Sequence, residues 1–431
     1  MKILHVAAHL GGGVGKAHSS LVDADALSIR RHYVLLEEPR DTRYAESISH
    51  SGAALTIAPD EATLLKLAAA ADIVQIEWWN HPRLYRCLCS NDWPLMRSVI
   101  WCHISGLAPP LVPPALLTLA DRFIFTSGCS LATLSGLDLS PADLRRIGVV
   151  NSGFGFPTRQ RSKEPPRREG SVSYLGTVSF SKMSRDFFQV VDDAGDSGML
   201  VEIWGMVEDD SEVASVAQAM RHPERIRFMG HAADPARVLE TTRIFLYLLK
   251  QDHFGTAENA LVEAMSYGCA PLVFPNPPEL AIVTDGETGF VAENAADAAG
   301  RLRWMREHPM ETERIGRNAA AHVAATRLPA HSAAAFARIY DDLLASEKRP
   351  VDFRAALGST AADWFMGTQN STASGQTDWM SLSTTPTKGS LHHFLACCPD
   401  DRSLQRLPAV GALSDQAESS HPREAALRAL R

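Results

Sequence analysis

Two carboxylates and a hydroxyl group lie close together in the segment TAENALVEAM, residues 256–265. Thr256 is expected to cap a helix that begins near Ala257, so that free backbone N–H groups lie just behind it. Because these N–H groups and the helix dipole attract negative charge, the start of this helix is an expected anion site. Glu258 falls in the first turn, where it either caps the helix or contacts a ligand.

The second carboxylate of this segment, Glu263, is surrounded by apolar residues in ALVEAM. A buried carboxylate is unfavourable unless hydrogen-bond donors reach it, and ribose hydroxyl groups would be suitable donors. Glu258 and Glu263 are five positions apart, so they do not project squarely from one helical face. They are therefore two separate candidates for binding roles.

A further candidate is the glycine-rich stretch GGGVGK, residues 11–16, which follows a short apolar run. Its spacing excludes an ATP-binding loop, because the first glycine position of that motif falls on Leu10 and the hydroxyl position on Ala17. It also excludes the dinucleotide fingerprint of an NAD oxidoreductase, whose third glycine falls on Lys16. Glycines at this place still let backbone N–H groups approach an anion, and a tight turn without a ligand is equally compatible.

These residues need a scaffold, and the apolar pattern predicts one in which strands alternate with helices. Strands are predicted at 3–8, 32–37, 54–57, 73–77, 98–103, 122–126, 172–175, 200–204, 226–228, 244–248 and 270–274. Helices are predicted at 16–29, 63–70, 184–193, 212–220, 234–242, 257–267, 295–307, 312–325 and 330–346. Such alternation is typical of doubly wound parallel sheets. Ligands of these sheets bind beyond the carboxyl ends of the strands, where the runs ending in Glu77 and His103 place both side chains.

Changes in composition divide the chain into parts. The stretch around 154–171 is rich in Pro, Arg and Lys and has no period, which is typical of a linker. We therefore predict an α/β protein with an N-terminal Rossmann-like domain at 1–155, a linker at 156–170 and a second Rossmann-like domain at 171–347. An extension at 348–431 is predicted to be partly disordered, because much of it is rich in Ser, Thr and Gly.

Bulk properties exclude several classes of protein. The 431-residue chain has a formal net charge of -8, which argues against general nucleic-acid binding. No apolar run approaches the roughly 18 residues of a membrane span, and the N-terminus is typical of a first strand rather than a signal peptide. The 7 cysteines are expected to be reduced thiols, because their number is odd and most lie in apolar runs. A cytoplasmic protein is predicted, with contact at the inner membrane surface left open.

The stretch 247–291 resembles the nucleotide-binding region of the retaining family 4 glycosyltransferases (glycosyl transferases group 1). In that family a loop of the form E-x-F-G leads into a helix reading L-x-E-A-M-x-x-G, then a Pro-rich strand and a G-x-x-G segment. The similarity extends over roughly residues 1–345, and it implies a GT-B fold, with two tandem Rossmann-like domains facing a central cleft. The matching residues are Phe254, Gly255, Leu261, Glu263, Ala264, Met265, Gly268, Pro271, Glu279, Gly286 and Gly289.

The resemblance implies how the second domain would hold a nucleotide sugar. Glu263 would bind the ribose. The family's first Glu, which contacts the donor sugar, has no direct counterpart: its position at the family spacing is Gly255, and Asp252 or Glu258 would replace it. The residues implied to line the donor in this loop are Asp252, Phe254, Gly255, Thr256 and Ala257.

The resemblance also implies roles elsewhere. Lys182 would bind the diphosphate, although Thr177 stands where the family has Arg. Gly205 matches a position near the base, and His103 matches a histidine near the transferred sugar, where a satisfied core histidine is the alternative. The glycines that would bring N–H groups to the diphosphate are Gly12, Gly13 and Gly15.

The implied reaction is retaining glycosyl transfer from a UDP- or GDP-sugar to a hydroxyl group of a glycan, a lipid-linked compound or a small molecule. The bond between the sugar and the nucleoside diphosphate would break through an oxocarbenium-like sugar. Lys182 and the helix N-terminus would stabilise the departing diphosphate. No metal or other cofactor is expected, because fixed cations and dipoles would do this work. Two alternatives stay open: a non-catalytic relative that binds a nucleotide sugar, and a nucleotide-sugar epimerase on the same fold.

Overall fold

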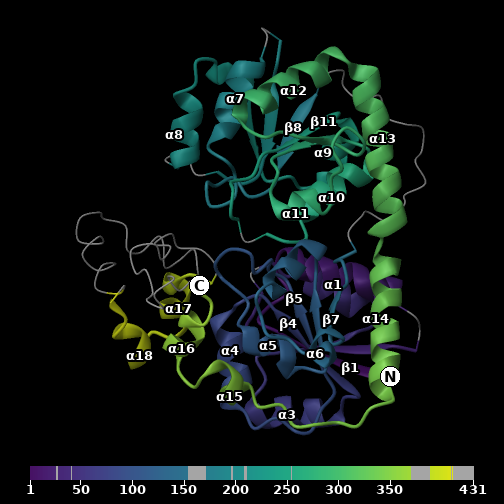
Figure 1. Ribbon diagram of the computed structural model, residues 1–431, viewed down its shortest axis with the longest axis vertical. Helices are drawn as coiled ribbons and strands as arrows, with labels where there is room; N and C mark the ends of the chain where they lie inside the picture. The colour runs from purple at the N-terminus through teal and green to yellow at the C-terminus, as the bar shows by residue number, and fades with distance from the viewer. Residues whose placement is uncertain are drawn as a thin grey trace. The chain divides into compact units, whose positions relative to one another are not determined.

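The computed structural model describes residues 1–25, 28–39, 41–153, 171–195, 198–207, 211–253, 255–369, 389–408 and 410. They form two compact units (Figure 1): Met1–Asn151 together with Ser332–Arg431, and Ser152–His331. The predicted linker at 156–170 lies outside the described residues. The predicted helix at 330–346, placed by the sequence in the second domain, lies mainly in the first unit.

The first unit is built on a seven-stranded parallel sheet in the order β3-β2-β1-β4-β5-β6-β7. Its inner strands are buried along their length because helices cover both faces, as their continuous apolar runs predict. The strands are β1 (Lys2–Ala7), β2 (Arg30–Leu35), β3 (Ala54–Ile57), β4 (Ile73–Trp78), β5 (Ser98–Cys102), β6 (Arg122–Phe125) and β7 (Ile147–Val149). The helices are α1 (Gly13–Ala24), α2 (Arg43–His50), α3 (Glu61–Ala70), α4 (Pro82–Ser90), α5 (Pro114–Leu119) and α6 (Pro141–Leu144), with a 3-10 helix at Gly128–Leu134.

The second unit repeats the design with six parallel strands in the order β10-β9-β8-β11-β12-β13. The two sheets confirm the predicted α/β class. The strands are β8 (Val172–Leu175), β9 (Val201–Trp204), β10 (Ile226–Gly230), β11 (Ile244–Tyr247), β12 (Ala270–Val273) and β13 (Phe290–Val291). The helices are α7 (Asp186–Ala194), α8 (Glu212–Gln218), α9 (Pro235–Thr241), α10 (Asn259–Ser266), α11 (Pro277–Leu280), α12 (Ala295–Glu307) and α13 (Pro309–Thr326), with a 3-10 helix at Pro223–Arg225.

Much of the C-terminal extension belongs to the core of the first unit. After α14 (Pro329–Leu344), four short helices follow, of which the first three pack beside α4 or α5 and the last packs on the two before it (Figure 1). Trp364 stacks on Tyr85 of α4 with ring centroids 5.8 Å apart, and Phe394 lies 5.9 Å from the same ring. The composition did not indicate this packing, because the buried residues of the extension are few and widely spaced. The helices are α15 (Phe353–Leu357), α16 (Ala361–Met366), α17 (Leu391–Cys397) and α18 (Arg402–Gln405).

The remainder of the predicted disordered stretch, 370–388 and 411–431, lies outside the described residues. Among the described residues, no helix has both the length and the apolar character to span a bilayer. All seven cysteines are free thiols, as predicted, and five of them are buried.

Candidate functional site

The glycine-rich stretch forms the connection between β1 and α1. The helix begins at Gly13, three residues before the predicted start at Lys16, and Gly12 is its N-cap with φ of 76°. Gly15 lies inside the first turn and packs against the preceding loop: a Cβ atom there would lie 1.7 Å from the carbonyl oxygen of Leu10. The sequence therefore needs glycine at 12 for its backbone conformation and at 15 for close packing.

The close approach of Gly15 to the Leu10 carbonyl predicts that residue 15 tolerates no side chain. The Gly15→Ala substitution should shift the loop and destabilise the first unit by about 1–3 kcal/mol, because backbone atoms cannot move away as a flexible side chain can. Chemical denaturation monitored on the first unit would measure the loss. Gly52→Ala does not serve as a control because its φ is positive, but Gly128→Ala in the same unit does: no atom lies within 4 Å of the added Cβ. An equal effect of both substitutions would contradict this account.

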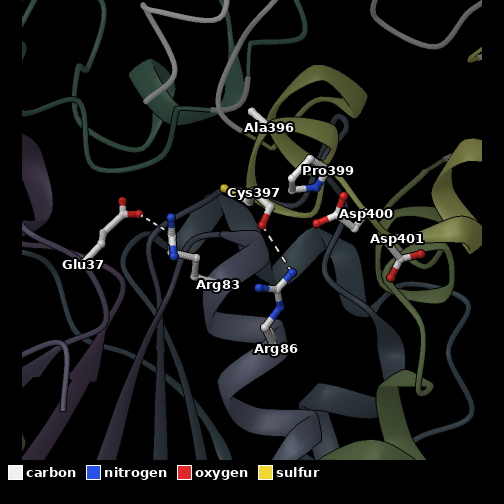
Figure 2. A pocket seen from close by; sticks show the side chains of 8 residues that line it. All are labelled: Glu37, Arg83, Arg86, Ala396, Cys397, Pro399, Asp400 and Asp401. Atoms are coloured by element: carbon white, nitrogen blue, oxygen red, sulfur yellow. Dashed lines mark hydrogen bonds and ion pairs between the residues drawn. The ribbon is translucent and has the colours of Figure 1, made fainter. Parts of the chain in front are cut away.

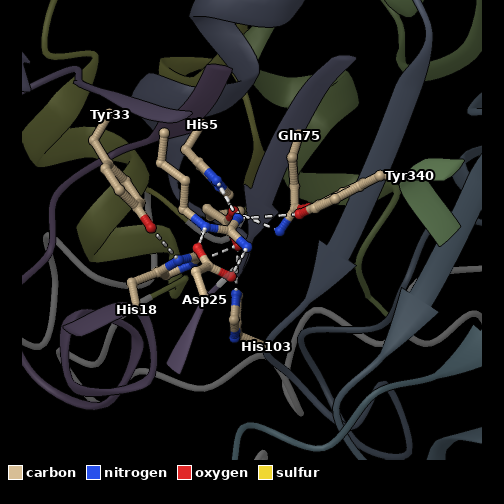
Figure 3. Close-up of polar contacts among 9 residues, drawn as sticks. His5, His18, Asp25, Tyr33, Gln75, His103 and Tyr340 are labelled. Carbon is tan, nitrogen blue, oxygen red and sulfur yellow. Dashed lines mark hydrogen bonds and ion pairs between the residues drawn. The ribbon is translucent and has the colours of Figure 1, made fainter. Parts of the chain in front are cut away.

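His103 directly follows β5, and its ring belongs to a buried polar network around Glu77 of β4 (Figure 3). Nε2 of His103 lies 2.9 Å from Glu77 Oε2, and Nε2 of His18 lies at the same distance from that oxygen. The other carboxylate oxygen, Oε1, receives hydrogen bonds from His5 Nδ1 at 2.7 Å and Gln75 Nε2 at 3.0 Å. The ends of their apolar runs predict His103 and Glu77 at the same sheet edge, and the structure joins them.

The network is anchored on its far side by Arg31 of β2. Its guanidinium donates to His5 Nε2 at 2.7 Å and to the Tyr340 hydroxyl of α14 at 3.1 Å, and it pairs with Asp25. Tyr340 in turn donates to Gln75 Oε1 at 2.6 Å. The buried charges of this region are thus compensated by one another rather than by water.

Burial and these contacts shift the pKa values of the network. Burial alone opposes ionisation of Glu77, but His18 and the hydrogen bonds from the surrounding histidines outweigh it and hold its pKa well below the usual range. Burial lowers the pKa of His5 to about 3 and also lowers that of His103. At neutral pH the network therefore holds a carboxylate against neutral His5 and His103 rings.

The second unit places the other predicted residues around the start of α10. The predicted cap is wrong: α10 begins at Asn259, its N-cap is Glu258, and neither Thr256 nor Ala257 is helical. The reason is the backbone of Glu258, which has φ of 38° and ψ of 58° and so interrupts the right-handed helix. A non-glycine residue in this left-handed region costs about 1–3 kcal/mol and persists only where other contacts compensate.

The side chain of Glu258 supplies those contacts. Its residue is 3% exposed, and its Oε2 accepts a hydrogen bond from the Tyr247 hydroxyl at 2.6 Å and pairs with Lys182 Nζ at 3.0 Å. Burial alone would raise the pKa of Glu258, but the charge of Lys182 outweighs it and keeps that pKa below its ordinary value. Glu258 does not cap α10 with its side chain, so the capping alternative is wrong.

The two candidates for the sugar-contacting carboxylate differ in position. Asp252 is exposed on a turn with φ of 59°, whereas Glu258 is buried beside Lys182. The structure thus brings Glu258 and Lys182 together and leaves Asp252 outside. Glu263 is 4% exposed within α10, and Phe254 lies outside the described residues.

His253 and Glu279 complete this buried cluster. Gly255 donates its N–H to His253 Nδ1 at 3.0 Å, so the other ring nitrogen, Nε2, faces Glu279 as donor at 3.1 Å and 3.2 Å from its two oxygens. Burial raises the pKa of Glu279. Gly255 also has to be glycine here, because a Cβ would lie 2.0 Å from Glu258 Oε1. His253 thus orders the loop that carries Glu258.

Gly205 lies just after β9, where the ends of neighbouring strands approach closely. Its N–H donates to the carbonyl of Gly230 at 2.8 Å, and a Cβ on it would lie 2.2 Å from the Gly176 oxygen. Three glycines, Gly176, Gly205 and Gly230, therefore end adjacent strands of the sheet. All three glycines are partly exposed, and they lie at the carboxyl ends of parallel strands, where ligands of such sheets bind.

One cavity of about 780 Å³ opens in the first unit between α4 and the turn from α17 to α18 (Figure 2). Four of its charged groups are engaged: Arg83 pairs with Glu37, Arg86 donates to the Cys397 carbonyl, and Asp401 caps α18. Among the predicted donor-site residues that the structure describes, none lines it. The lining residues are Glu37, Arg83, Arg86, Ala396, Cys397, Pro399, Asp400 and Asp401.

Three buried histidines were not predicted as site residues: His5, His18 and His253. His5 interrupts the apolar run of β1, and His18 falls on the buried face of α1 beside Ala17 and Leu21. A polar residue inside an apolar run was the available signal, because burial without a partner is unfavourable. That signal identifies a buried polar group, but only the fold shows that the groups share one carboxylate.

Comparisons with known proteins find one matching family and several structures of similar fold. Residues 159–322 match the family described as Glycosyl transferases group 1. D-rhamnosyltransferase WbpZ of Pseudomonas aeruginosa is 25% identical over 278 residues, which cover 59% of this chain and 70% of that protein. Anabaena HepE in complex with UDP superposes with a TM-score of 0.61 at 16% identity, covering 79% of this chain and 100% of HepE. The lipopolysaccharide outer core galactosyltransferase WaaB, in its apo form, superposes with a TM-score of 0.56 at 14% identity over 79% and 100% of the two chains.

Two parallel Rossmann-like sheets of this topology define the GT-B fold, which these solved structures share. Over residues 159–322 the chain matches the glycosyl transferases group 1 family, the retaining glycosyltransferases of family 4. The family match and the rhamnosyltransferase relative identify the protein as a glycosyltransferase that uses a nucleotide sugar.

Proposed function

We propose that this glycosyltransferase moves a hexosyl group from a UDP- or GDP-sugar to a carbohydrate hydroxyl, free or lipid-linked. One observation carries the proposal. Glu258 and Lys182 form an ion pair at the start of α10, and Glu258 Oε1 has no hydrogen-bond partner among the described residues. An unsatisfied buried carboxylate oxygen is costly, and sugar hydroxyl groups are donors that would satisfy it.

Lys182 is the proposed contact to the diphosphate. Its side chain is 25% exposed, and its three donors allow it to keep Glu258 while binding a phosphate oxygen. The first N–H groups of α10 lie beside Glu258 and add the positive end of a helix dipole. Stabilising charge on the departing diphosphate is the main way such a site accelerates glycosyl transfer.

The remaining predicted residues receive proposed roles in the same scheme. Glu263 binds the ribose, Gly205 lets the base approach the sheet edge, and Gly12 with Gly13 and Gly15 presents N–H groups to the diphosphate. His103 contacts the transferred sugar. No protein nucleophile is assigned, because in retaining transfer of this kind the acceptor attacks the face that the leaving group vacates.

The acceptor is proposed from the relatives. One of them is a rhamnosyltransferase and another a lipopolysaccharide outer core galactosyltransferase. A polysaccharide or lipopolysaccharide precursor is therefore the proposed acceptor class, and a lipid-linked one would place the reaction at the inner membrane surface.

Calorimetric binding tests this donor site. UDP, GDP, ADP and NAD are titrated first, followed by the sugars of the nucleotide that binds. In Glu258→Gln, affinity for the nucleotide sugar should fall about 10-fold, the value of one hydrogen bond to a charged group, while affinity for the free nucleotide stays within about 2-fold. Asp252→Asn is the matched control and should change neither.

Three results would overturn the proposal. Binding of none of the four nucleotides would remove the donor site. A loss in Asp252→Asn without a loss in Glu258→Gln would assign the sugar contact to the exposed carboxylate. Nucleotide-sugar binding without donor hydrolysis or transfer would identify the non-catalytic alternative.

A further inference from the structure

The Glu77 network has one open end. His5 and His18 use both ring nitrogens within it: His5 contacts Glu77 and Arg31, and His18 contacts Glu77 and the Tyr33 hydroxyl. His103 uses only Nε2, toward Glu77. Among the described residues, Nδ1 of His103 makes no hydrogen bond, and its side chain is 6% exposed. The network thus ends on one nitrogen that can face a ligand.

The contacts also determine where the protons lie. An ionised carboxylate only accepts hydrogen bonds, so the nitrogen atoms that bond to Glu77 carry hydrogen. His5 fits this rule twice, because its Nδ1 donates to Glu77 while its Nε2 accepts from the Arg31 guanidinium, which has no lone pair to offer. By the same rule His103 carries its proton on Nε2, and its Nδ1 holds a lone pair.

We infer that Glu77 is a positioning residue that fixes His103 as a neutral ring whose Nδ1 accepts a hydrogen bond from a hydroxyl group of the transferred sugar. This inference rests on the proposed function, because it says which partner donates and which accepts in the proposed contact between His103 and the sugar. The carboxylate–imidazole pair resembles the outer partners of ligating and catalytic histidines, which set tautomer and ring orientation.

The network is unsuited to binding a metal ion, the other role that such a cluster could have. His5, His18 and Glu77 lie close enough to share a metal ion. The Arg31 guanidinium, however, lies 2.7 Å from His5, so a further cation would lie close to a positive charge. The Glu77 carboxylate already has several partners, and its role is to hold the rings around it.

The first test is the proton position itself. Nitrogen-15 NMR of the histidine rings, with His103 assigned from the signals lost in His103→Asn, should show Nε2 protonated and Nδ1 unprotonated between pH 6 and 8. Observation of the opposite tautomer, or of a doubly protonated ring at neutral pH, would overturn the inference. This measurement needs no turnover, so it stands even where the nucleotide panel fails.

The second test is kinetic and uses Glu77→Gln with Tyr340→Phe as its control. A glutamine amide would present an NH₂ group to rings that also donate, so the His103 tautomer should become mixed and kcat should fall about 10- to 100-fold, with the KM for the nucleotide sugar changed less than about 3-fold. Tyr340→Phe removes a hydroxyl from the same network without touching His103. It should keep the wild-type tautomer and kcat.

The two variants separate positioning from stability. Equal kinetic losses in Glu77→Gln and Tyr340→Phe would show that the network only stabilises the fold, and unchanged kcat in a folded Glu77→Gln protein would also reject the inference. Where Glu77→Gln does not fold, the wild-type tautomer decides the question.

Discussion

Replacement of Lys182 by alanine should lower kcat about 100- to 1,000-fold, the loss typical of removing one group that stabilises developing charge on a leaving group. The reason is geometric, since Lys182 Nζ lies 3.0 Å from Glu258 at the start of α10, where we place the diphosphate. The substitution also leaves the buried Glu258 carboxylate without its main compensating charge. Steady-state transfer from the nucleotide sugar identified by calorimetry measures the effect.

The matched control for this prediction is Lys250→Ala, which removes an exposed lysine whose backbone N–H bonds to the Lys182 carbonyl. It should leave kcat within about 2-fold, because an exposed charge outside the site contributes little. Similar losses of kcat in both variants would show that the overall charge of the protein, and not a contact of Lys182, causes the effect. Full activity in Lys182→Ala would remove this residue from the proposed diphosphate contact.

Replacement of Phe394 by alanine should destabilise the first unit by about 3–5 kcal/mol, the usual loss for a fully buried aromatic ring. Phe394 is completely buried in α17, where its ring lies 5.4 Å from that of Phe365 and 5.9 Å from that of Tyr85 in α4. A loss of this size is a large part of the stability of a domain, so the thermal transition of the first unit should fall by about 10 °C.

Hydrogen exchange assigns that loss to its place in the chain. In Phe394→Ala the amides of α4 should exchange faster, whereas those of β11 and β12 in the second unit should keep their protection. Leu344→Ala in α14 is the control, because this side chain is 37% exposed and its truncation should change stability little. Unchanged exchange in α4 would show that the extension is not part of this core.

Regular elements were predictable because their signals are local. The strands β3 and β8 and the helix α12 match the predicted bounds, since each is an apolar or periodic run with clear breaks at both ends. The short strands β7 and β13 were missed, because three and two residues carry too little pattern. The helices of the extension were missed for a related reason: their burial comes from α4 and α5, far away in the sequence.

Candidate site residues could be named from the sequence, but the contacts between them could not. The roles of Glu263, Lys182 and the glycines stay predictions. Asp252 and Glu258 differ in burial and in the ion pair that Glu258 forms with Lys182, which the sequence does not reveal. Likewise, Glu77 and His103 were placed at one sheet edge by strand ends alone. Which nitrogen of which ring faces the carboxylate follows only from packing in three dimensions.

The location of the extension in the first unit has a consequence for the order of folding during synthesis. The second unit is one continuous stretch, Ser152–His331, so its contacts are complete once that stretch has left the ribosome. The first unit is interrupted by it, and side chains as late as Phe394 and Leu404 belong to the same core as Trp78. The N-terminal sheet therefore emerges first but becomes complete last, with part of the surface of α4 exposed until α17 arrives.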